Sequence, residues 1–218
     1  MSFAFFVVKK PMPPATDFHF YLITDRRQVP AGRSLLQQVE AALIGGVRAV
    51  QLREKDLSAA ELLPLARELR DLTRAHSARL LINDRIDVAL AVDADGVHLG
   101  GHSLPTSTAR RLLGPERLIG VSTHHLDEIT AATEAGADFV TFGPIFATPS
   151  KAAYGPPLGL EALRTACGNA PLPVFALGGI SADKLPQLRA AGCRHCAAIG
   201  AVLAAADATL AARAFANL

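Results

Sequence analysis

One segment of the chain shows the fold most clearly. Residues 47–76 read VRAVQLREKDLSAAELLPLARELRDLTRAH. The short apolar run Val47–Arg53 contains β-branched residues and stops at polar side chains, which is typical of a β-strand. An amphipathic helical pattern, Ala59–His76, follows after a short polar turn. We therefore predict a strand, a turn and a helix as one structural unit.

The same unit recurs until the chain holds eight of them. Continuous apolar runs are typical of strands buried on both faces, which indicates a parallel sheet covered by helices. Eight units in roughly 200 residues fit a closed (β/α)8 TIM barrel, whereas an open doubly wound sheet usually has fewer strands and a glycine-rich first turn. No such turn follows the first run, which ends at Thr24. The predicted strands are Phe18–Thr24, Val47–Arg53, Arg79–Ile82, Gly96–Leu99, Leu118–Ser122, Asp138–Phe142, Pro173–Leu177 and Cys196–Ile199. The predicted helices are Ser34–Ile44, Ala59–His76, Ile86–Val92, Pro105–Leu113, Leu126–Ala135, Gly159–Cys167, Ala182–Ala191 and Ala204–Asn217.

The composition fits one α/β domain with a sizeable core. The chain has 218 residues, of which 50% are hydrophobic and 19% are charged. We predict a barrel over residues 18–218 and an N-terminal tail over residues 1–17, which includes the proline-rich stretch Pro11–Pro14. The tail resembles a truncated signal peptide, but its basic residues follow the apolar run and no small-residue cleavage site comes after them.

Charge, cysteine content and hydropathy argue against several classes of protein. The formal net charge of +2 is too small for a dedicated nucleic-acid-binding protein, so any attraction for phosphate has to be local. Three cysteines are too few for a disulfide framework, which indicates a reducing compartment. No apolar run approaches the roughly 20 residues of a membrane span. We expect a soluble, cytoplasmic protein that binds small molecules rather than nucleic acid or membrane, and its assembly into homo-oligomers stays open.

The second predicted strand ends in a set of phosphate-binding residue types. Alternation places Gln51, Arg53 and Lys55 on one side of the chain as it leaves the sheet. An unpaired buried amide costs about 1–3 kcal/mol, so Gln51 has to have a partner. Arg53 offers a rigid fork of donors and Lys55 a mobile point charge, a pair suited to phosphate oxygens. The alternative is that both cations pair with Glu54 or Asp56 on the rim.

Two further strand ends carry candidate site residues. Asn83 and Asp84 follow the third strand and suit a substrate amide or a Mg²⁺ ion, which one aspartate and substrate phosphates can hold together. The alternative is that they cap the next helix. After the fifth strand, Ser122 can donate to a phosphate and His124 can carry a proton, unless His124 is only a solvated loop residue. His98, inside the fourth strand, is more typical of a core histidine.

The loops after the last three strands suit anion capture. Thr148, Ser150 and Lys151 lie in a proline-braced loop after the sixth strand. Glycines follow the seventh and eighth strands, the usual phosphate site of such barrels, although they could serve tight turns alone. Two anion sites across one barrel mouth indicate a reaction that joins two phosphorylated fragments. The glycines are Gly178, Gly179 and Gly200.

Together these motifs resemble the thiamine phosphate synthase family, which includes the related thiazole tautomerases. The resemblance covers roughly residues 19–205, and the motifs occur in the family's order. It implies a synthase that couples hydroxymethylpyrimidine diphosphate to a thiazole phosphate and releases pyrophosphate. The matching segments are Gln51–Lys55, Ile82–Arg85, Ala94–Gly100, Gly120–His124, Gly143–Phe146, Thr148–Lys151 and Leu177–Ile180.

The resemblance also implies a role for each matching residue. Gln51, Arg53 and Lys55 would hold the diphosphate, and Asn83 would contact the pyrimidine. Asp84 would bind Mg²⁺, while Ser122 and Lys151 would steady the leaving pyrophosphate. The thiazole phosphate would be held by Thr148, Ser150, Gly179 and the backbone of Ile199 and Gly200.

Departures from the family pattern keep two alternatives open. Synthases usually read Gly-Gln-x-Asp after the fourth strand, with the aspartate as a second Mg²⁺ ligand, but this chain has Ser103 there, so Mg²⁺ binding is in doubt. Gly200 also stands where serine is common. These departures favour a metal-independent thiazole tautomerase, an isomerase with His124 as acid and base. A non-catalytic barrel that binds thiazole phosphate or thiamine phosphate is the other alternative. The complete set at Gln51, Arg53 and Lys55 favours the synthase.

Overall fold

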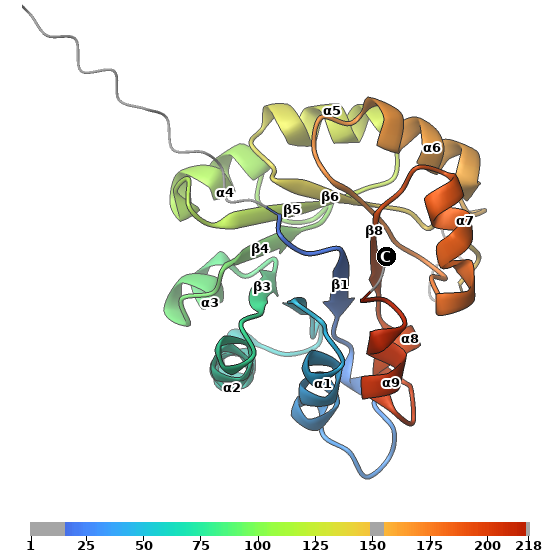
Figure 1. Ribbon diagram of the computed structural model, residues 1–218. Helices are drawn as coiled ribbons and strands as arrows, with labels where there is room; N and C mark the ends of the chain where they lie inside the picture. The colour runs from blue at the N-terminus through green and yellow to red at the C-terminus, as the bar shows by residue number, and fades with distance from the viewer. Residues whose placement is uncertain (1–15, 149–154, 217–218) are drawn as a thin grey trace, which may run out of the picture.

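The computed structural model describes residues 16–148 and 155–216 of the chain. Eight parallel strands form a closed barrel in chain order, and helices surround it (Figure 1). The predicted (β/α)8 barrel is therefore confirmed. The strands are β1 Phe20–Ile23, β2 Ala49–Leu52, β3 Arg79–Asn83, β4 Gly96–Leu99, β5 Leu118–Thr123, β6 Phe139–Phe142, β7 Val174–Ala176 and β8 His195–Ala198. The helices are α1 Leu35–Ile44, α2 Ala59–Ala75, α3 Ile86–Ala91, α4 Thr106–Leu113, α5 Leu126–Glu134, α6 Gly159–Asn169, α7 Leu185–Ala190, α8 Gly200–Leu203 and α9 Ala208–Arg213, with 3-10 turns η1 Arg26–Gln28 and η3 Ala182–Lys184.

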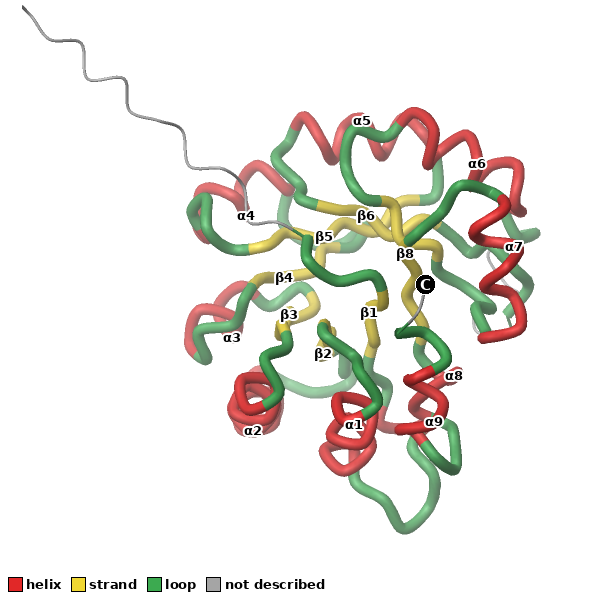
Figure 2. Tube along the Cα trace, viewed as in Figure 1, coloured by secondary structure: helices red, strands yellow, loops and turns green. Residues whose placement is uncertain are grey.

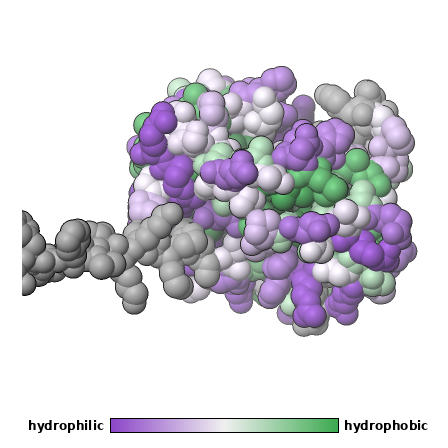
Figure 3. All heavy atoms as spheres, turned by 90° about the horizontal axis from the view of Figure 1, so that it is seen from above, coloured by the Kyte–Doolittle hydropathy of each residue, from purple (hydrophilic) through white to green (hydrophobic). Residues whose placement is uncertain are grey.

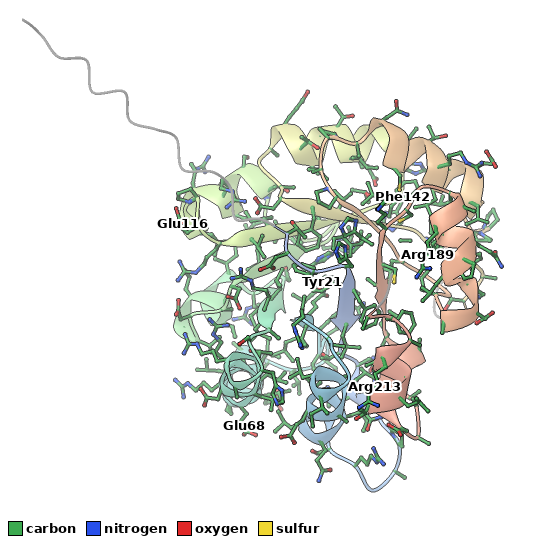
Figure 4. The ribbon with its side chains drawn as sticks, viewed as in Figure 1. Tyr21, Glu68, Glu116, Phe142, Arg189 and Arg213 are labelled. Carbon is green, nitrogen blue, oxygen red and sulfur yellow. The ribbon has the colours of Figure 1, made fainter. Side chains whose placement is uncertain are left out.

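Two hydrophobic cores explain why the barrel closes. Residues that alternate along each strand point either outward, under the helices, or inward, into the barrel. The inward core contains an aromatic group in which Phe18 lies 5.7 Å from Tyr21, 5.7 Å from Phe139 and 5.3 Å from Phe175, measured between ring centroids. Figure 4 shows Tyr21 within the ring of strands, whereas Glu68 lies at the outside of the molecule. A strand's alternation therefore tells which of its side chains can reach the barrel mouth.

One predicted helix is wrong in its bounds. The expected helix Ala204–Asn217 starts too early: α8 ends at Leu203, before that range, a loop follows, and α9 begins only at Ala208 (Figure 2). Asp207 ends the loop because its carboxylate accepts a hydrogen bond from the Leu210 amide at 2.9 Å and so caps α9. The first of the two short helices, α8, begins at Gly200, two residues after the end of β8. The turn η1 after β1 was also not predicted.

The described part of the chain begins at residue 16, just before the barrel. The predicted tail over residues 1–17 stays a prediction, since residues 1–15 lie outside the described part of the chain. No helix in the described segments is long and apolar enough to cross a membrane. The face shown in Figure 3 is mainly hydrophilic and carries one hydrophobic area.

Candidate active site

The carboxyl ends of β2 and β3 bring polar side chains to the inner face of the barrel. Ala49 on β2 and Leu81 on β3 belong to the inward core. Because alternate residues of a strand share a face, Gln51 and Asn83 point inward as well. Strand register then places Asn83 beside His98 of β4. The structure therefore gathers at one rim residues that the sequence predicts for the diphosphate and the pyrimidine.

The buried amide of Gln51 has the partner that the sequence requires. Its Nε2 donates to Tyr21 Oη at 3.1 Å, and both side chains are buried. Burial also raises the pKa of Tyr21 well above its usual range, so this hydroxyl stays neutral. The hydrogen bond to Tyr21 thus holds the Gln51 side chain in one orientation inside the barrel.

The acidic residues beside Arg53 are occupied by another cation, Arg26. The Glu54 carboxylate, whose side chain is 1% exposed, accepts hydrogen bonds from Thr24 Oγ1 at 2.7 Å and from Arg26 Nη1 at 3.1 Å. The Arg26 guanidinium also binds Asp56 through two bonds of 2.7 and 2.8 Å. The alternative that Arg53 pairs with Glu54 or Asp56 is therefore wrong.

Arg53 itself is a half-buried cation at the rim. Among the described residues it forms no salt bridge with a carboxylate, while Arg26 forms two on the same side of the barrel. Burial lowers the pKa of the Arg53 guanidinium, against the opposing effect of Asp25 and Glu54 nearby. A partly desolvated cation without a carboxylate partner favours the binding of an anion. Lys55, predicted for the same role, is exposed on the turn after β2.

Asp84 is presented to solvent rather than used as a helix cap. Its backbone has φ +64°, and its side chain is exposed. Arg85 is the N-cap of α3, and no side chain makes a capping bond there, so the capping alternative is wrong. Ser103 Oγ accepts a hydrogen bond from the Gly100 amide at 2.8 Å and closes a turn. In the described part of the chain, no three His, Cys, Asp or Glu residues form a group that could hold a metal by themselves.

Ser122 on β5 contacts a buried histidine. Its Oγ lies 3.0 Å from His98 Nε2, and Thr141 Oγ1 lies 3.5 Å from the same nitrogen. His98 is 3% exposed, and burial lowers its pKa to about 3, so the ring is neutral near pH 7. The prediction that His98 is a core histidine is confirmed. Its contact with Ser122 was missed, although a histidine within an apolar strand was a signal for a polar partner.

His124 lies on the loop after β5 and faces the next helix. Its Nδ1 is 3.6 Å from Glu128 Oε2, and the side chain is 46% exposed. Thr123 does not cap α5, because its Oγ1 donates to the Thr141 carbonyl oxygen at 3.1 Å. The structure shows no contact between His124 and Ser122 within the described residues. The acid and base role of His124 stays a prediction.

The glycines after β7 are required by the loop that follows β6. Gly178 has φ +97°, and a Cβ there would lie 2.5 Å from Pro144 Cβ. Gly179 has φ +64°, and its Cβ would lie 2.7 Å from the Ala147 carbonyl oxygen. The Gly178 carbonyl accepts a hydrogen bond from Phe146 N at 3.0 Å. The two glycine amides donate no hydrogen bond to the described residues, so they remain available to an anion.

The rest of the predicted phosphate site is described in part. Ile199 and Gly200 directly follow β8 at the same end of the barrel. A Cβ on Gly200 would lie 2.6 Å from Gln28 Oε1, so the Gln28 side chain occupies the space of a residue-200 side chain. Thr148 is half-buried in the loop after β6. Ser150 and Lys151 lie outside the described residues.

Known proteins match this chain over most of its length. A sequence model of the family described as thiamine monophosphate synthase matches residues 20–202. A relative from Geobacter sulfurreducens, provisionally named a thiamine-phosphate synthase, is 56% identical over 191 residues, which are 88% of this chain and 89% of that protein. The thiamine-phosphate synthase of Moorella thermoacetica is 45% identical and covers 92% of this chain and 94% of its own. The structure of a thiamine phosphate pyrophosphorylase from Pyrococcus furiosus has a TM-score of 0.82 at 37% identity, covering 91% of this chain and 93% of that one.

Proposed function

Because this chain belongs to the thiamine monophosphate synthase family, we propose that its barrel mouth couples hydroxymethylpyrimidine diphosphate to a thiazole phosphate. The family, the barrel and the transferase class that the sequence predicts are confirmed by these relatives and by the closed sheet. The substrates are small phosphorylated molecules. The residue roles, the metal, the cytoplasmic location and the oligomeric state remain predictions.

The observation that carries the proposal is the state of Arg53. Arg26 binds both Glu54 and Asp56, and the Arg53 guanidinium at the rim forms no salt bridge within the described part of the chain. A diphosphate can supply the missing anion, with Gln51 and Asn83 pointing inward beneath it. Lys55, exposed on the turn after β2, would add positive charge to the same side.

The reaction needs a site that stabilises a growing negative charge. The bond between the pyrimidine methylene carbon and the diphosphate oxygen breaks, and its electron pair leaves with pyrophosphate. The thiazole nitrogen then donates its electron pair to the methylene carbon, so one C–N bond replaces one C–O bond. The Arg53 cation would neutralise the charge that develops on the departing oxygens, and the Ser122 hydroxyl would donate a hydrogen bond to them. Donors that are already in place need no reorganisation at the moment of reaction.

The opposite side of the mouth would hold the second substrate. The amides of Gly178 and Gly179 are free of partners among the described residues, and Ile199 and Gly200 lie at the next strand end. Backbone donors suit a phosphate group that takes no part in the bond exchange. Thr148 and Ser150 would add hydroxyl donors from the loop after β6. The phosphate would orient the thiazole nitrogen toward the methylene carbon.

The residues present fit a magnesium ion that the substrate helps to hold. Mg²⁺ is commonly bound by one or two carboxylates together with substrate phosphate oxygens. Asp84 is exposed, and its carboxylate accepts no hydrogen bond from the described residues. When bound, Mg²⁺ would supply positive charge to the diphosphate. Ser103 has no carboxylate to offer as a second ligand, and its hydroxyl accepts a hydrogen bond from the Gly100 amide.

The test mixes purified protein with both substrates and Mg²⁺ and measures thiamine phosphate and pyrophosphate. Product formation that EDTA and Asp84→Ala abolish is the expected result. Asp87→Ala is the matched control, since Asp87 is an exposed neighbour paired with Arg85 and should leave activity intact. Isomerisation of a thiazole carboxylate phosphate without coupling, lost in His124→Ala, would establish the tautomerase instead. Tight binding of thiazole phosphate with neither activity would establish the non-catalytic barrel.

A further inference from the structure

His98 is a buried polar group that the proposed reaction does not use directly. It lies on β4 inside the barrel, with its ring 5.7 Å from that of Tyr21 and 5.9 Å from that of Phe139 between centroids. Nε2 is 3.0 Å from Ser122 Oγ, whereas Nδ1 is buried and has no hydrogen-bond partner among residues 16–148 and 155–216. The ring therefore contacts the site through one nitrogen only.

The unequal surroundings of the two nitrogens decide which of them carries the proton. A neutral imidazole has one N–H donor and one acceptor nitrogen. If the proton were on Nδ1, a buried N–H would lack an acceptor, and orphaned buried N–H groups are rarer in proteins than under-used acceptors. With the proton on Nε2, the donor is satisfied by Ser122 Oγ, and by Thr141 Oγ1 at 3.5 Å. The geometry thus favours the Nε2–H tautomer.

That tautomer determines the direction in which Ser122 donates. Because Nε2–H donates to Oγ, the Ser122 proton has to point elsewhere, and Ser122 is half-buried near the carboxyl end of β5, on the inner face that it shares with Leu118. We propose that His98 is a positioning residue that orients the Ser122 hydroxyl as a donor to an anionic oxygen at the barrel mouth. The anion is the leaving diphosphate if the proposed function holds. The opposite tautomer would draw the Ser122 proton inward and present lone pairs to that anion.

The tautomer can be measured without any substrate. Nitrogen-15 NMR of the free protein distinguishes Nε2–H from Nδ1–H histidines, and loss of one signal in His98→Gln assigns it among the seven histidines. We expect a neutral Nε2–H ring. An Nδ1–H or a charged ring at pH 7 overturns the proposal, whether or not the protein is a synthase.

Ligand binding tests the consequence for Ser122. Calorimetric titration with inorganic pyrophosphate should be weakened about ten- to hundredfold by Ser122→Ala, the loss expected for one hydrogen bond to a charged group. His98→Met, which fills a similar volume without a donor, should weaken it by a similar factor. His98→Gln, which returns an N–H near the position of Nε2, should recover most of the affinity. In the double variant His98→Met/Ser122→Ala the losses should not add.

Controls separate positioning from damage to the fold. His195→Met changes a histidine at the opposite end of the barrel, beside His19, and should leave pyrophosphate binding unchanged. In the coupling assay, His98→Met should lower kcat and leave KM for the thiazole phosphate unchanged, since the cradle at Gly178 and Gly179 is untouched. Equal losses in His98→Gln and His98→Met, or additive losses with Ser122→Ala, overturn the proposal. If coupling is absent but pyrophosphate binding follows this pattern, the proposed function fails and the role of His98 stands.

Discussion

Replacing Arg26 by methionine tests whether this residue keeps Arg53 available for substrate. The variant keeps the aliphatic stem but removes the guanidinium that binds Glu54 and Asp56. Glu54 keeps its bonds from Thr24 Oγ1 at 2.7 Å and from the amide of residue 26 at 3.1 Å. It loses one charge-assisted bond, so the free energy of unfolding should fall by about 1–3 kcal/mol. The pair with Asp56 is exposed and should add little.

The two released carboxylates should then compete with substrate for Arg53. We expect KM for the pyrimidine diphosphate to rise about fivefold, the equivalent of one modest ion pair, while KM for the thiazole phosphate stays constant. Urea unfolding and steady-state coupling kinetics measure the two effects. Arg74→Met is the control, because Arg74 is 51% exposed and pairs with Asp93, which precedes β4 at the other end of the barrel. A loss of stability with an unchanged KM would show that Arg26 does not shield Arg53.

Three further outcomes follow from the described contacts. Ser103→Asp should lower the Mg²⁺ concentration that gives half-maximal coupling, and an unchanged requirement would place the metal elsewhere. Gly178→Ala should lower the free energy of unfolding in urea by more than the roughly 1–3 kcal/mol of backbone strain alone, because its Cβ would lie 2.5 Å from Pro144. Gly192→Ala is the control: at φ +80° its Cβ meets no atom within 4 Å, so only the backbone strain should reduce its stability. Burial lowers the pKa of His195 from 6.5 to about 4, so the unfolded chain binds the extra proton and stability should fall as pH drops from 6.5 toward 4. His195→Met should flatten that part of the urea-unfolding profile, and an unchanged slope would contradict it.

The sequence predicts the barrel because the signal is repeated. Each strand that is buried on both faces reads as an apolar run, and each helix that covers the sheet reads as an amphipathic pattern. The last helix was misplaced because Ala204–Leu218 is rich in alanine and has no glycine or proline to mark a break. The break depends on a single carboxylate, Asp207, which caps α9.

The site was predictable where strand alternation alone decides direction. Gln51 and Asn83 point inward as alternation requires, and Gln51 has the partner that its burial demands. The partners of the charged and polar side chains were not predictable, because they lie on or directly after neighbouring strands and are distant in sequence. Arg26 and Glu54 are 28 residues apart, and no periodic pattern connects them. The same holds for His98 and Ser122, which come from neighbouring strands but 24 residues apart.

The contact between Gln28 and Gly200 couples the side chains that can be accommodated at two positions far apart in the sequence. The Gln28 amide is held by Asp25, which accepts a bond from its Nε2 at 2.9 Å, and its oxygen stands where the first atom of a side chain at position 200 would be. A side chain at position 200 therefore displaces the end of the Gln28 side chain, which is flexible and can turn aside at the cost of its bond to Asp25. An engineer who introduces Gly200→Ser into this scaffold can remove the conflict with Gln28→Ala in the same step, so sequence libraries should vary the two positions together.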